Sequence, residues 1–174
     1  MQQQKIICLL VILGICAITD LKEKKIKNNW IIIGIIGAFI FLVQGKNVQV
    51  IKDTLLLSLV FFGVLFPLFF IRALGAGDVK LLCMTVLYIG RQGLEIFLIG
   101  MVLTSGMLAV GKMLYFGTFK KRMEYFVTYL QRFLMTRTAE EYGIPSETTE
   151  VIGMAVPVFV GGVSWCLWNY IGSL

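Results

Sequence analysis

The chain has 174 residues, of which 58% are hydrophobic; its formal net charge is +6 and its mean hydropathy is +0.86. This composition excludes an ordinary soluble domain. It indicates a bundle of several membrane helices that leaves little room for a separate soluble domain. The chain contains no histidine, which excludes Ser-His-Asp and Cys-His catalysis. Its four cysteines form no CxxC pair, so we expect neither a metal site nor a disulfide framework.

Six apolar stretches follow one another along the chain and predict an all-α polytopic membrane protein of about six transmembrane helices. They are residues 5–19, 29–44, 54–74, 79–90, 93–117 and 151–172. The first and fourth are shorter than the roughly 20 residues that a full span prefers. Short spans place polar groups and water closer to the bundle interior. We expect one membrane domain covering residues 1–174.

The basic residues concentrate in alternate loops. The first, third and fifth loops hold Lys22, Lys24, Lys25 and Lys27, then Arg72 and Lys80, then Lys120, Lys121, Arg122, Arg132 and Arg137. The second and fourth hold only Lys46, Lys52 and Arg91. The positive-inside rule therefore places the three basic loops in the cytoplasm and both chain ends outside. We expect these charges to meet lipid headgroups rather than nucleic acid.

The long fifth loop, residues 118–150, has a pattern of its own. Apolar residues recur at helical spacing over 119–135 among basic ones, which predicts an amphipathic helix on the inner membrane surface. A helix packed on the bundle is the alternative. Residues 138–150 are polar and contain Gly143 and Pro145, which indicates a surface loop.

Two aspartates carry the strongest functional signal. Asp20 closes the first apolar stretch and Asp78 precedes the fourth, so both face the cytoplasmic side in this topology. An ionisable group at membrane depth is costly and indicates function. Two nearby carboxyls cannot both ionise, so they share a proton and can serve as base and acid in peptide hydrolysis.

The residues around Asp78 are unusual for a membrane helix. Gly75 and Gly77 lack Cβ atoms, so the chain can turn and approach a substrate backbone closely. Structural alternatives remain open: Asp78 as the N-cap of its helix, and Asp20 paired with Lys24 at i+4. Lys80 can anchor the helix end at the headgroups or contact an acidic part of a substrate.

The sequence resembles a known family at these positions. Gly75-Ala76-Gly77-Asp78-Val79-Lys80 matches the GxGDxK signature of type IV prepilin peptidases, a branch of the GxGD membrane aspartyl proteases. Asp20, with its basic loop and Ile26-Lys27-Asn28, resembles the first aspartate of that family and the segment after it. Lys27 stands where proline is common. The spacing of the two aspartates relative to the spans is also similar.

The resemblance implies an endopeptidase that removes the short basic leader of type IV prepilins, pseudopilins or Flp-type pilins at the cytoplasmic face of a prokaryotic cell membrane. It implies catalytic roles for Asp20 and Asp78, no cofactor and no metal, and an active-site loop with Gly75, Gly77, Lys80 and Asn28. The CxxC motifs of longer relatives that also N-methylate their product are absent. N-methylation by this chain is therefore not expected.

Two functions of other classes compete with this interpretation. In a proton-coupled transporter subunit the two acids would relay protons, and inverted repeats with broken helices would mark the two halves. The Gly75–Asp78 segment has no counterpart in the second half of the sequence. In a non-catalytic assembly factor the acids would serve packing, and both would tolerate asparagine.

Overall fold

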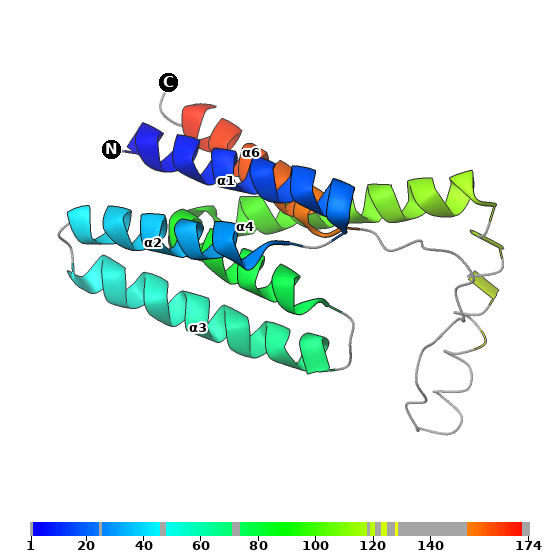
Figure 1. Cartoon of the computed structure of the whole chain (residues 1–174), viewed down its shortest axis with the longest axis horizontal. Helices are drawn as coiled ribbons and strands as arrows, with labels where there is room; N and C mark the ends of the chain where they lie inside the picture. Colours follow the sequence, from blue (N-terminus) through cyan, green and yellow to red (C-terminus); the bar gives the residue numbers. More distant parts are fainter. Residues whose placement is uncertain are drawn as a thin grey trace. The chain divides into compact units, whose positions relative to one another are not determined.

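The computed structural model describes residues 2–24, 26–45, 48–70, 74–117, 119–120, 123–124, 128 and 153–171. All regular structure in these ranges is helical (Figure 1). Helix α1 spans Gln2–Glu23, α2 spans Asn28–Gln44 and α3 spans Val48–Phe70. Helix α4 spans Ala76–Tyr115 and α6 spans Ala155–Ile171. The expectation of an all-α protein is confirmed for the described residues.

Helix α4 is two helices joined at one residue. Forty residues would extend about 60 Å, twice the hydrocarbon thickness of a bilayer. Gly90 interrupts it with φ 67° and ψ −167°, a conformation essentially reserved for glycine. The chain reverses direction there, as Figure 1 shows. The sequence predicted two stretches, 79–90 and 93–117, with a short loop between them; one glycine replaces that loop.

By its internal contacts the chain divides into two compact units, residues 1–105 with 153–174, and residues 106–152. In the first unit, α1 runs antiparallel to α2 and to α6, and α3 folds back along α2 (Figure 1). The starts of α2 and α6 therefore lie at the end of the unit where α1 finishes. In the second unit the structure describes the end of α4 and a few further residues, so the predicted amphipathic helix over 119–135 lies largely outside the described residues.

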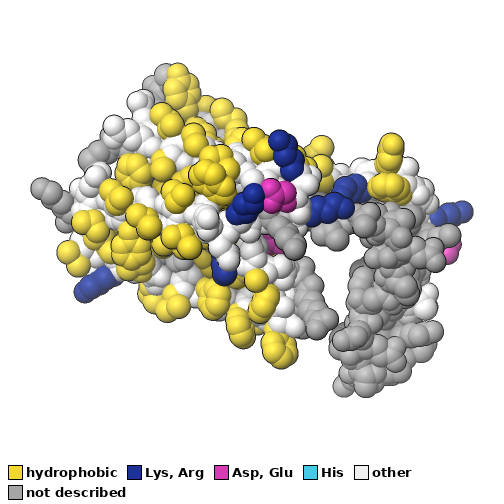
Figure 2. All heavy atoms as spheres, viewed as in Figure 1, with side chains coloured by type: hydrophobic (Ala, Val, Ile, Leu, Met, Phe, Trp, Pro, Cys, Tyr) yellow, Lys and Arg dark blue, Asp and Glu magenta, His cyan; other side chains and the backbone are white. Residues whose placement is uncertain are grey.

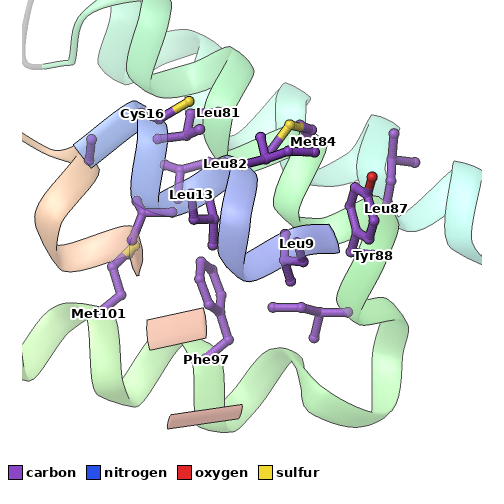
Figure 3. Close-up of a cluster of buried hydrophobic side chains, with 14 of the residues drawn as sticks. Leu9, Leu13, Cys16, Leu81, Leu82, Met84, Leu87, Tyr88, Phe97 and Met101 are labelled. Carbon is purple, nitrogen blue, oxygen red and sulfur yellow. The ribbon is translucent and has the colours of Figure 1, made fainter. Parts of the chain in front are cut away.

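The core of the first unit forms between α1, the two parts of α4, and α6. Figure 3 shows the side chains that α1 and α4 contribute. They are Leu9, Leu13, Cys16, Leu81, Leu82, Met84, Leu87, Tyr88, Phe97 and Met101, all at most 8% exposed. Small residues let the second part of α4 approach α6 closely: a Cβ on Gly161 would lie 2.7 Å from the Phe97 carbonyl oxygen.

The outer surface of the helices is apolar rather than polar. Large hydrophobic side chains such as Leu59, Val64 and Phe70 are 64–78% exposed. Figure 2 shows hydrophobic side chains across much of the helical body, with charged side chains gathered toward one end. Three helices, α1 from Gln3, α3 and α4, are long and apolar enough to cross a membrane, and α2 and α6 are shorter apolar helices. The chain is an α-helical membrane protein.

Candidate active site

Asp20 lies in the last turn of α1 with its carboxyl group buried, only 7% of the residue being exposed. Its Oδ2 accepts a hydrogen bond of 3.2 Å from the backbone N–H of Ala155. Ala155 is the first residue of α6, where backbone N–H groups have no partner within the helix. The carboxyl therefore caps another helix 135 residues away in sequence.

Asp78 is the third residue of α4 and is half-buried. Its Oδ2 accepts a hydrogen bond of 3.2 Å from the backbone N–H of Gly75, just before the helix begins. A side chain at this third position that reaches back to the preceding N–H forms one half of a capping box. Asp78 is therefore not the N-cap residue, which the sequence left open as an alternative.

The two carboxyl groups lie at the same end of the first unit, where α1 finishes and α4 begins. The segment after Asp20 and the segment of Asp78 meet through Ile26 and Gly77, although 58 residues separate the two acids. In each carboxyl, Oδ2 is held by a backbone N–H at a helix start. Within the described residues, no hydrogen bond reaches Oδ1 of either aspartate. The arrangement fixes both side chains through Oδ2.

The two glycines of the Asp78 segment have different surroundings. A Cβ on Gly75 would lie 3.0 Å from Asp78 Oδ2, a distance tighter than nearly all real contacts. A Cβ on Gly77 would lie 3.4 Å from Ile26 Cβ, in the segment that links α1 to α2. Gly75 thus leaves room for the carboxyl itself, and Gly77 packs at ordinary distance against the chain that follows Asp20.

Lys80 and Asn28 also meet at this end of the bundle. The Lys80 ammonium donates to the Asn28 side-chain oxygen across 3.4 Å, and both residues are exposed. The structure therefore brings four predicted residues of the active-site loop, Gly75, Gly77, Lys80 and Asn28, to the segments that carry the two aspartates. In the part of the chain that the structure describes, no three His, Cys, Asp or Glu side chains are grouped to hold a metal ion.

Sequence reasoning missed the contribution of α6. Gly153 and Ala155 contact the Asp20 carboxyl, but they act through a missing side chain and a backbone N–H. Neither produces a pattern that distinguishes it from other small residues at a helix start. The one available signal was a glycine near the start of the last apolar stretch, residues 151–172, and it could not indicate which residue it would meet.

The fold and the two acids define a class: an α-helical membrane protein with two carboxyl groups at the same end of its bundle. Comparison with known proteins then assigns the family. The profile of the type IV leader peptidase family matches residues 7–110, more than half of the chain and including both aspartates. The chain belongs to this family of proteases. No curated protein and no solved structure matches it.

Proposed function

We propose that this chain is an aspartic endopeptidase that removes the leader peptide of type IV prepilin-like proteins, with Asp20 and Asp78 as its catalytic pair. The observation that carries the proposal is that the segments of Asp20 and Asp78 meet at one end of the bundle, through Gly77 with Ile26 and Lys80 with Asn28, within the family-matched region. Each carboxyl is anchored through Oδ2 to a backbone N–H. A fixed pair of acids is what water-mediated peptide hydrolysis requires.

The reaction follows from the chemistry of a carboxyl pair that shares one proton. The ionised carboxylate takes a proton from water, and the resulting hydroxide oxygen attacks the scissile carbonyl carbon. The protonated carboxyl donates its hydrogen bond to the carbonyl oxygen as negative charge develops there. When the C–N bond breaks, the nitrogen takes a proton from the pair and leaves as an amine. Burial of Asp20 strengthens these electrostatic effects.

The proposed substrate carries a short basic leader followed by an apolar helix. A transmembrane helix must expose a peptide bond before it can be cut, because its amides are already hydrogen-bonded. The exposed Gly75–Ala76 backbone, next to Asp78, offers polar groups where a locally extended substrate can pair. The exposed Lys80 and Asn28 lie close by and can contact the substrate polypeptide.

The proposed topology has six crossings, with the α1–α2 and α3–α4 connections and residues 118–150 in the cytoplasm. This topology is inferred from the distribution of Lys and Arg alone, and it would put the proposed cleavage site on the cytoplasmic side. Labelling of single cysteines at Lys27 and at Lys52, in a variant lacking the four native cysteines, tests it. We expect Lys27→Cys to react with an impermeant thiol reagent only from the cytoplasmic side and Lys52→Cys only from the outside.

The decisive experiment is cleavage of a prepilin-like substrate in membranes by wild type, Asp20→Asn and Asp78→Asn. Asparagine keeps the size of the side chain but cannot exchange the proton. We expect wild type to cut at the leader boundary, as N-terminal sequencing of the product would show, and each folded variant to be inactive. Full cleavage by either variant would reassign the catalytic pair. Absence of cleavage by wild type would favour a transporter or assembly role.

A further inference from the structure

The start of α6 surrounds the Asp20 carboxyl, although residues 153–171 lie outside the region matched by the family. The Ala155 N–H donates to Oδ2 across 3.2 Å, and Ala155 is fully buried. A buried carboxylate without hydrogen-bond partners is costly, and more so at membrane depth. The N-terminus of a 17-residue helix supplies both a donor and the positive end of the helix dipole.

Gly153 contributes through the absence of a side chain. A Cβ at this position would collide with Asp20 Oδ2, and would lie 2.8 Å from Asp20 Cγ and 3.2 Å from Oδ1. All three atoms of the carboxyl group therefore face the Gly153 backbone. A larger residue could be accommodated only if the carboxyl moved, and Asp20 sits among buried neighbours that limit such movement.

We propose that Gly153 and the Ala155 N–H are positioning groups for Asp20, holding its carboxyl in a single orientation for the reaction. The proposal rests on the proposed function of Asp20 as one of the catalytic pair. It gives α6 a specific role: the last helix of the chain sets the rotamer of an acid carried by the first. A displacement of about 1 Å in such a group can reduce turnover about a hundredfold.

The first test removes the donor and keeps the helix. Proline lacks the N–H but is well tolerated at the first position of a helix, which is where Ala155 stands. We expect Ala155→Pro to lower kcat by about tenfold to a hundredfold with KM within about threefold of wild type. Ala155→Ser adds bulk but retains the N–H, and should recover most of the turnover. Equal losses in the two variants would show that packing matters rather than the donor.

The second test measures the Gly153 contact without any substrate. We expect Gly153→Ala to lower the melting temperature in detergent by about 3–10 °C because the new methyl group collides with the carboxyl. In an Asp20→Ala background the obstacle is gone, and the same substitution should cost little. Gly63→Ala is the matched control, since a Cβ there meets no atom within 4 Å. An equal decrease in both backgrounds would overturn the contact.

The two tests separate failure of this proposal from failure of the proposed function. If wild type cleaves the substrate and both Gly153→Ala and Ala155→Pro keep wild-type kcat, the positioning role is wrong while the catalytic pair stands. If wild type cleaves nothing, the proposed function and the catalytic meaning of these contacts fail together. The melting-temperature cycle still decides whether Gly153 holds the Asp20 carboxyl.

Discussion

Lys80 of α4 and Asn28 of α2, 52 residues apart in sequence, are joined by a hydrogen bond of 3.4 Å between the lysine ammonium and the amide oxygen. Asn28 follows the segment that leaves Asp20, and Lys80 lies two residues after Asp78. This bond therefore connects the two segments that carry the acids. Because both side chains are exposed, it contributes little to stability, and its value lies in fixing the edge of the site.

Substitution of this pair is expected to weaken substrate binding. We predict that Lys80→Met and Asn28→Ala each lower kcat/KM by about threefold to tenfold, mainly through KM, because one hydrogen bond of this kind is worth about 1 kcal/mol. The double variant should be no worse than the poorer single variant, since both remove the same contact. Lys52→Met, an exposed lysine of α3, should leave cleavage unchanged. Multiplicative losses would show that the two residues act independently.

The two glycines before Asp78 are expected to respond differently to alanine. Gly75→Ala should lower kcat about tenfold, because its Cβ would lie 3.0 Å from Asp78 Oδ2 and displace the carboxyl. Gly77→Ala should keep kcat within about threefold, since its Cβ would meet Ile26 at 3.4 Å, an ordinary contact. Steady-state cleavage of a prepilin-like substrate gives both values. A greater loss in Gly77→Ala would contradict this ranking.

Much of the fold follows from apolar periodicity. The stretch 29–44 lies within one residue of α2, and the stretch 151–172 begins four residues before α6 and ends one residue after it, because polar residues bound both stretches. The loop predicted between 90 and 93 is absent because a single glycine with positive φ reverses the chain. Arg91 suggested a loop on polarity alone, yet it is helical. A change of chain direction that takes place at a single residue leaves no polar segment by which the sequence could indicate it.

The candidate site also has a part that the sequence indicates and a part that it does not. The aspartates could be named as candidate site residues because a charge in an apolar sequence is visible without structure. Their anchors could not, because the Ala155 and Gly75 N–H groups belong to the backbone and carry no sequence signature. The pairing of α1 with the start of α6 is set by helix packing across 135 residues. Residue type indicated the candidate reacting groups, whereas tertiary contacts determined which backbone groups anchor them.

The reversal at Gly90 is expected to be intolerant of any side chain. Gly90→Ala places a Cβ in ordinary contact with Thr54 at 3.9 Å, so its penalty is conformational rather than steric. We predict a loss of about 1–3 kcal/mol in the free energy of unfolding. Gly63→Ala in the middle of α3 should instead gain up to about 1 kcal/mol, because alanine favours helix. Opposite shifts in melting temperature would support this prediction. Equal shifts would show that a side chain at position 90 carries no conformational penalty.

The core is expected to be stabilised by packing rather than by transfer from water. In a bilayer, an unfolded helix still lies among apolar chains, so burying Phe97 gains little transfer free energy. Phe97→Ala should nevertheless lower stability by about 2 kcal/mol, the cost of an unfilled cavity of one ring. Phe70→Ala removes the same atoms from a residue that is 78% exposed, and should change stability by less than about 0.5 kcal/mol. Thermal unfolding in detergent compares the two variants directly. If Phe70→Ala proves as harmful as Phe97→Ala, the exposed face of α3 is covered by a partner in the folded protein, and the core around Phe97 is not its main source of stability.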